Sequence, residues 1–171
     1  MDTQFDRLTG LLNREALRAV GEELIAEART SGGMLGFIHA DIDGMKYTDD
    51  MYGFPAGDRL IVSIAQVIQA RFPERAVAGR VGGDEFLIIM PTMNEGKTEA
   101  LAEAMRAEAK TIIVMGGRDD EVPTEPVTLT LGLSSYPRHG EDLETLWIAA
   151  EEATHAGKHS GRDRVCWPDS G

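Results

Sequence analysis

Two short acidic segments each follow an apolar run, and together they could bind a hard metal ion. The first is Asp41-Ile42-Asp43, at the end of the run that begins at Met34, and the second is Asp84-Glu85, directly after Gly82-Gly83. Mg²⁺ binds carboxylate and carbonyl oxygens and keeps several waters that phosphate oxygens can replace. If the two segments lie on neighbouring strands, Asp41 and Asp84 can converge on one such ion. The glycines would let the backbone approach a triphosphate without a Cβ in the way.

Each acidic segment taken alone is also compatible with a solvated surface turn. Two glycines between apolar runs are an ordinary signal for a tight hairpin, whatever follows them. The combination of both segments, each at the end of an apolar run, favours a shared binding function.

The apolar patterning predicts helices packed on a sheet. Strand-like runs are predicted at 34–41, at 75–81 and 85–90 around the Gly82-Gly83 turn, and at 127–133. Helical spacing predicts helices over 13–29, from about 57 onward, over 95–110 and over 141–158. The segment 116–126 is polar, contains proline and is predicted to be a loop. This alternation is typical of a layered α/β sandwich.

Composition excludes several classes of protein. The 171 residues fit one domain, and with a net charge of −12 no stretch is dominated by Lys and Arg, which argues against a nucleic-acid groove. An acidic protein can still bind a phosphate-bearing ligand if metal ions neutralise the contact. The only cysteine, Cys166, can form no disulfide within the chain. We see no signal peptide and no apolar run of about 20 residues, so a cytoplasmic domain without membrane contact is expected.

The segment Arg80-Val81-Gly82-Gly83-Asp84-Glu85-Phe86 resembles the signature of GGDEF domains, the diguanylate cyclases of bacteria. Four more blocks resemble this family in the same order, which makes the likeness specific and extends it over nearly the whole chain: Asp6 to Arg14, Asp41 to Lys46, Tyr52-Gly53 with Gly57-Asp58, and Lys158 to Val165. The resemblance implies one domain over 1–171, with an opening segment at 1–14 and a C-terminal strand and tail at 159–171. It also implies a central, mostly antiparallel sheet flanked by helices, as in the nucleotidyl cyclase and polymerase palm fold.

The resemblance also implies a role for each matching residue. Asp41, Asp84, Glu85 and the Ile42 carbonyl would ligate Mg²⁺ or Mn²⁺, and Asp84, Glu85 and Asp41 would be the catalytic groups. Glu85 would be either a second-metal ligand or the group that helps to deprotonate the attacking 3′-hydroxyl. Asp58 and Asp49 would bind the guanine of the substrate. Its β- and γ-phosphates would be bound by Lys46, Lys158 and Arg162. At Gly82 and Gly83 the backbone itself would approach the substrate closely.

The activity implied is condensation of two GTP molecules into cyclic di-GMP and pyrophosphate. Each domain would bind one GTP, so catalysis would need a homodimer, and two metal ions would assist the phosphoryl transfer. Because the chain begins close to the family's opening segment, we expect either the C-terminal piece of a longer bacterial signalling protein with a sensory domain upstream, or a minimal stand-alone form.

Several positions depart from the family pattern. Asp49 stands where the family has an Asn that contacts guanine, and an ionised carboxylate cannot donate a hydrogen bond as an amide does. Glu151, Thr154 and His155 replace the usual Asp, Leu and Tyr, and Pro73 to Ala76 replaces an inhibitory Arg-x-x-Asp site. The alternative is therefore a weak or inactive module that binds GTP or a partner protein. A cyclase that makes an adenine-containing dinucleotide is disfavoured, because Asp58 suits the donor edge of guanine.

Other residues that could do chemistry are predicted to be structural. His39 lies on a predicted buried strand and is expected to be packed there, and Trp147 is expected in the core. His155 and His159 are expected on the surface of the last helix.

Overall fold

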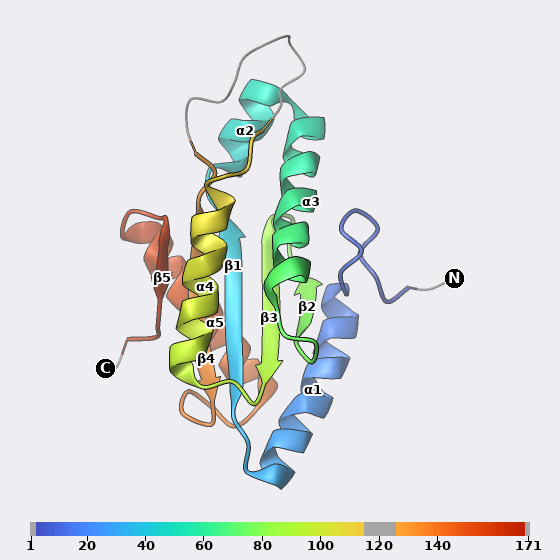
Figure 1. Ribbon diagram of the computed structural model, residues 1–171, viewed down its shortest axis with the longest axis vertical. Helices are drawn as coiled ribbons and strands as arrows, with labels where there is room; N and C mark the ends of the chain where they lie inside the picture. Colours follow the sequence, from blue (N-terminus) through green and yellow to red (C-terminus); the bar gives the residue numbers. More distant parts are fainter. Residues whose placement is uncertain (1–2, 115–125, 170–171) are drawn as a thin grey trace.

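The computed structural model describes residues 3–114 and 126–169, which form a five-stranded sheet with helices on both faces (Figure 1). The strands are β1 (Leu35–Ile42), β2 (Val77–Arg80), β3 (Glu85–Pro91), β4 (Leu129–Tyr136) and β5 (Arg164–Cys166), in the spatial order β2-β3-β1-β4-β5. All neighbours pair antiparallel except β4 and β5, which are parallel. The predicted α/β sandwich with a mostly antiparallel sheet is confirmed.

The described residues form five helices, three of which begin with a side-chain cap. They are α1 (Arg14–Ser31), α2 (Met45–Tyr52), α3 (Phe54–Arg71), α4 (Glu95–Ala109) and α5 (Leu143–His159). The side chains of Asn13, Asn94 and Asp142 accept hydrogen bonds from backbone N–H groups in the first turns of α1, α4 and α5. Gly32 ends α1 in the left-handed conformation, as expected for a glycine at that position.

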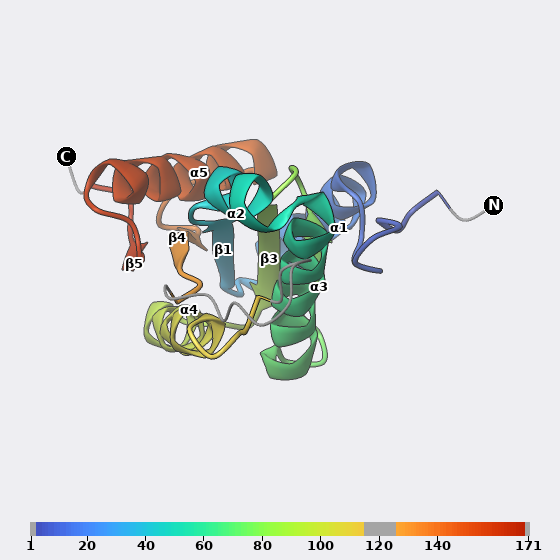
Figure 2. The ribbon, with the colours of Figure 1, turned by 90° about the horizontal axis from the view of Figure 1, so that it is seen from above.

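The core has two parts, one on each face of the sheet. Because strand side chains alternate, Leu35, Phe37, Leu87 and Ile89 pack against α1 and α5, whereas Ile38, Ala40, Phe86 and Ile88 pack against α3 and α4. Figure 2 shows the sheet between α5 on one side and α4 on the other. None of the helices in the described ranges is long and apolar enough to cross a bilayer.

Helix α5 lies directly on β4 because Gly132 has no side chain. A Cβ at Gly132 would lie 1.9 Å from the Ala150 carbonyl oxygen and 2.4 Å from the Thr154 nitrogen, both backbone atoms of α5. This close approach sets where the C-terminal half of α5 passes over the ends of the central strands.

The structure differs from the sequence prediction at two connections. Helix α2 was not predicted, and α3 begins at Phe54 rather than near 57, with Gly53 at a φ of 86° between the two helices. Only Thr48 of α2 is fully buried, so this short helix has little apolar periodicity to reveal it. The predicted hairpin is present, but four residues rather than two connect β2 to β3. Residues 116–125 of the predicted loop lie outside the described residues.

Candidate active site

Acidic side chains from β1 and from the turn before β3 meet at one end of the sheet. Asp41 lies directly opposite Glu85 in the antiparallel ladder, so the two side chains share the face that α1 and α5 cover. The backbone N–H of Ile42 donates to the Asp84 carbonyl at 3.1 Å. The condition set by the sequence, that the two acidic segments lie on neighbouring strands, is therefore met.

The carboxylates at this end of the sheet repel one another. Burial and the charge of Asp84 raise the pKa of Asp41, although the nearby Lys158 ammonium acts in the opposite direction. Burial raises the pKa of Glu85 as well, and the charges of Asp41 and Asp84 add to the effect. Negative charge is thus held at a partly buried position where a cation would relieve the repulsion.

Lys158 supplies one cation from the last turn of α5. Its Nζ lies 3.1 Å from Asp41 Oδ1, 3.2 Å from the Ile42 carbonyl oxygen and 2.7 Å from Asp43 Oδ1. The carboxylate of Asp41 and the carbonyl of Ile42 therefore already point at the same positive charge.

Asp43 organises this end of the sheet, a role that its position in the sequence does not reveal. Its side chain is 6% exposed and accepts hydrogen bonds from Thr128, Thr130 and Lys158, each at 2.7 Å, and from the Asp163 backbone N–H at 3.1 Å. Burial alone would raise the pKa of Asp43, but these donors outweigh it and lower the pKa. Asp43 thus joins β1, β4 and the turn after α5.

The oxygen atoms at this position fit a magnesium ion. Carboxylate and carbonyl oxygens are the protein ligands that Mg²⁺ prefers, and two of them already converge on the Lys158 ammonium. Within residues 3–114 and 126–169, no three His, Cys, Asp or Glu side chains are gathered closely enough to hold an ion by themselves. An ion held here would therefore need water or phosphate oxygens to complete its coordination.

A pocket of about 260 Å³ opens over these side chains between β1, β3 and α5. We call it the acidic pocket, and its lining residues are His39, Asp41, Glu85, Glu151, Glu152, Thr154, His155 and Lys158. His39 and Trp147 are packed as predicted: His39 is 1% exposed with its Nδ1 2.8 Å from Thr154 Oγ1, and Trp147 is 3% exposed. Burial lowers the pKa of His39 to about 4.

The turn between β2 and β3 is held by arginines outside it. Arg80 donates through Nη2 to the Gly83 carbonyl at 2.7 Å and pairs with Asp6 at 3.3 Å, and Arg14 donates to the Val81 carbonyl at 2.9 Å. A Cβ at Gly82 would lie 2.3 Å from the Glu85 carboxylate, whereas a Cβ at Gly83 would meet nothing within 4 Å. Gly82 therefore makes room for Glu85, and a side chain at Gly83 would point into open space.

The other residues predicted to bind substrate make no hydrogen bond or ion pair with this cluster in the described part of the chain. Lys46 in α2, Asp58 in α3 and Arg162 after α5 are exposed. Asp49 is half-buried and packs over Gly57, where a Cβ would lie 2.1 Å from Asp49 Oδ1. Asp49 is thus placed beside the residue that precedes Asp58.

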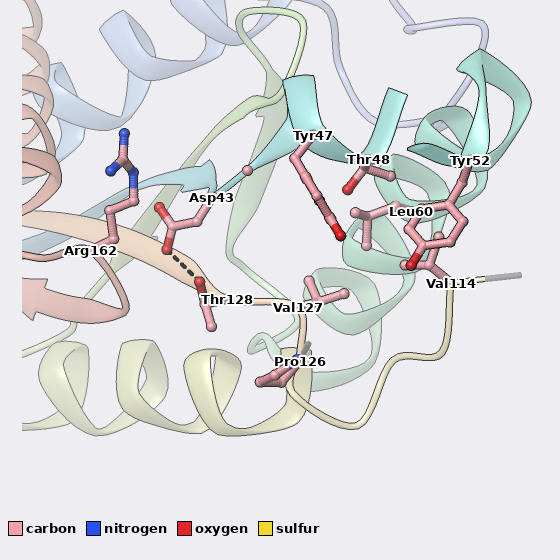
Figure 3. A pocket seen from close by; sticks show the side chains of 11 residues that line it. Asp43, Tyr47, Thr48, Tyr52, Leu60, Val114, Pro126, Val127, Thr128 and Arg162 are labelled. Atoms are coloured by element: carbon pink, nitrogen blue, oxygen red, sulfur yellow. Dashed lines mark hydrogen bonds between the residues drawn. The ribbon is translucent and has the colours of Figure 1, made fainter. Parts of the chain in front are cut away.

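Asp43 lines a second pocket, of about 310 Å³ (Figure 3). Asp43 and Arg162 lie at one end of it and Tyr52 with Leu60 at the other. The sequence did not predict this pocket, because its walls come from α2 and from segments on both sides of residues 115–125.

Comparison with known proteins gives the same family as the fold and the Gly82-Gly83-Asp84-Glu85 turn indicate. The family model for the GGDEF domain of diguanylate cyclases matches residues 3–164, and the chain belongs to the GGDEF family. Among its relatives, the diguanylate cyclase DosC of Escherichia coli is 29% identical over 94% of this chain, and the cyclic di-GMP phosphodiesterase NbdA of Pseudomonas aeruginosa is 30% identical over 95%. The chain spans only 34% of DosC and 20% of NbdA.

The same fold is found in solved structures of the family. The GGDEF domain of DgcB from Caulobacter crescentus, solved in complex with c-di-GMP, superposes with a TM-score of 0.91 at 28% identity, covering 99% of this chain and 98% of that chain. The resemblance inferred from the sequence is therefore confirmed for both family and fold.

Proposed function

We propose that this domain is a diguanylate cyclase that condenses two GTP molecules into cyclic di-GMP. The observation that carries the proposal is that Asp41, Glu85 and the backbone of Asp84 lie at the adjoining ends of β1 and β3, with the Lys158 ammonium 3.1 Å from Asp41 and 3.2 Å from the Ile42 carbonyl. Membership of the GGDEF family supports the same conclusion.

Each of these residues would have a different role in the reaction. Asp41, Asp84 and the Ile42 carbonyl would hold Mg²⁺ or Mn²⁺, with Glu85 as a ligand of a second ion or as the acceptor of the 3′-hydroxyl proton. Bound metal supplies a more acidic 3′-hydroxyl and neutralises charge on the leaving group. The 3′-oxygen of one GTP bonds to the α-phosphorus of the other, the α–β bond breaks, and pyrophosphate leaves. Repeating the step in the opposite direction closes the ring and releases a second pyrophosphate.

The remaining predicted residues bind and orient the nucleotide. Lys158, Arg162 and Lys46 offer positive charge to the β- and γ-phosphates, and the open backbone at Gly83 leaves room for them. Asp49 in α2 packs against Gly57 in α3, the residue before Asp58, and both carboxylates would meet the guanine edge. Each domain holds one GTP, so two copies must face each other for both bonds to form.

Feedback by product at the usual inhibitory position is not expected here. Pro73 and Ala76 stand where that site needs Arg and Asp, and Arg75 between them is exposed and pairs with Glu27 at 3.4 Å.

A second candidate is a GTP-binding regulatory module with little catalysis. Asp49 in place of the family's Asn favours it, and the match to NbdA, a protein named for phosphodiesterase activity, is consistent with it. Incubation with GTP and Mg²⁺ followed by chromatography separates the two. The cyclase is supported if the unaltered protein forms cyclic di-GMP with a specific activity that rises with protein concentration, and if Asp84→Ala forms none. The regulatory module is supported if GTP binds and no product forms.

A further inference from the structure

Two histidines on the outer face of α5 form a pair that no step of the proposed reaction uses. His155 and His159 are one helical turn apart, and their Nε2 atoms lie 3.1 Å from each other. Their ring centroids are 4.5 Å apart with an interplanar angle of 73°. Both rings are exposed, so solvent ions can reach them.

The distance between the two nitrogens suits a shared transition-metal ion. Imidazole nitrogens bind Zn²⁺ at about 2.0–2.1 Å, so two of them at angles between about 90° and 109° are separated by about 2.8–3.4 Å. The observed 3.1 Å lies within this range. Two histidines at positions i and i+4 of a helix are also the spacing used by helical zinc sites.

The surroundings of the pair favour a cation. Glu151 and Glu152 are exposed one turn before His155 and line the acidic pocket with it. His159 is the last residue of α5, where the carbonyl ends of the helix carry partial negative charge. The neighbouring cation Lys158 is turned inward and paired with Asp41 and Asp43.

We propose that His155 and His159 bind one divalent transition-metal ion, such as Ni²⁺, Zn²⁺ or Cu²⁺, on the rim of the acidic pocket. The metal replaces the hydrogen bond between the two Nε2 atoms: each ring then gives the lone pair of Nε2 and carries its proton on Nδ1. Water completes the coordination shell, because the described residues offer no third His, Cys, Asp or Glu in the same cluster. Mg²⁺ does not compete, since it prefers oxygen ligands.

This site is independent of the proposed cyclase activity and is tested by binding alone. Ni²⁺ is titrated into the whole chain by calorimetry in the presence of excess Mg²⁺. One Ni²⁺ per chain is expected, and His155→Ala and His159→Ala should each weaken binding at least about tenfold, since even altering a ligand's hydrogen-bond partner costs roughly 10–100-fold. Alanine is the best helix former, so neither variant should disturb α5.

Two control variants accompany this test. One tests whether binding depends on the spacing of the two histidines and not only on their number. The other tests whether the acidic cluster binds the ion instead. The double change Ala156→His with His159→Ala keeps the number of histidines but breaks their spacing on an exposed helix face, and it should bind Ni²⁺ as weakly as His159→Ala. Asp84→Asn should leave Ni²⁺ binding unchanged. Absence of binding by the unaltered chain, binding that survives loss of both histidines, or binding that is lost in Asp84→Asn would overturn the proposal.

Discussion

The carboxylate of Asp43 and the ammonium of Lys158 lie 2.7 Å apart, and this contact joins the end of β1 to the last turn of α5. Asp43 also accepts hydrogen bonds from Thr128, which directly precedes β4, and from Thr130 within β4. Lys158 in turn pairs with the Asp41 carboxylate and donates a hydrogen bond to the Ile42 carbonyl. The acidic cluster is therefore positioned by an aspartate that is not itself among the predicted ligands.

Replacing Asp43 should destabilise the fold. Asp43→Ala leaves the Thr128 and Thr130 hydroxyls and part of the Lys158 charge without an acceptor, and it should lower the free energy of unfolding by about 2–4 kcal/mol. Urea unfolding measures the loss. Asp43→Asn keeps an acceptor oxygen and should lose less, and Asp50→Ala, an exposed change on α2, should stay within about 0.5 kcal/mol. Equal effects of Asp43→Ala and Asp50→Ala would contradict the role given to Asp43.

Magnesium without nucleotide should stabilise the domain if the acidic cluster binds it. Binding to the folded state alone contributes about 2.7 kcal/mol at a hundred times Kd, which corresponds to a rise in Tm of roughly 5–10 °C for a domain of this size. Thermal unfolding monitored by circular dichroism at increasing Mg²⁺ measures the effect. The rise should saturate and should be absent in Asp41→Asn and Asp84→Asn, whereas Asp50→Asn retains it. A rise that persists in both cluster variants would show that Mg²⁺ acts elsewhere.

Asp49→Asn should strengthen GTP binding. The amide would restore a hydrogen-bond donor toward the base and would remove a negative charge beside Gly57. A lost partner in a polar site costs about 1–3 kcal/mol, so affinity for a non-hydrolysable GTP analogue with Mg²⁺ should rise roughly 5–150-fold. Asp50→Asn makes the same charge change one residue away on the exposed surface, and it is the matched control. The same gain in both variants would mean that net charge, and not the guanine contact, is responsible.

Glycines 132 and 83 should differ sharply in their tolerance of a methyl group. Gly132→Ala places a Cβ against the backbone of α5 and should cost about 3 kcal/mol or more, because the helix must move off β4. Gly83→Ala meets open space and should leave urea stability within about 0.5 kcal/mol. If the Gly83 backbone lies against phosphates as proposed, Gly83→Ala should still lower cyclic di-GMP formation. Full activity in a stable Gly83→Ala protein would remove Gly83 from the phosphate site.

Much of the architecture could be predicted because its residues are locally periodic. Leu17, Leu24, Ile25 and Ala28 recur at helical spacing and are buried on one face of α1. The same reasoning fails for α2, whose eight residues lie between Gly44 and Gly53 and bury only Thr48 completely. It also fails for the length of the β2–β3 turn, which depends on Arg80 reaching the Gly83 carbonyl and on room for Glu85 beside Gly82.

The sequence by itself determined the family, the sheet with its covering helices and the acidic residue types, because these depend on short-range patterns and ordered motifs. Only the tertiary structure decided that Asp41 lies opposite Glu85 and that Lys158 turns inward to Asp43. Those relationships depend on strand register, on the approach of α5 to β4 at Gly132 and on side-chain rotamers. They bring together atoms as many as 115 residues apart in the chain, which no local pattern encodes.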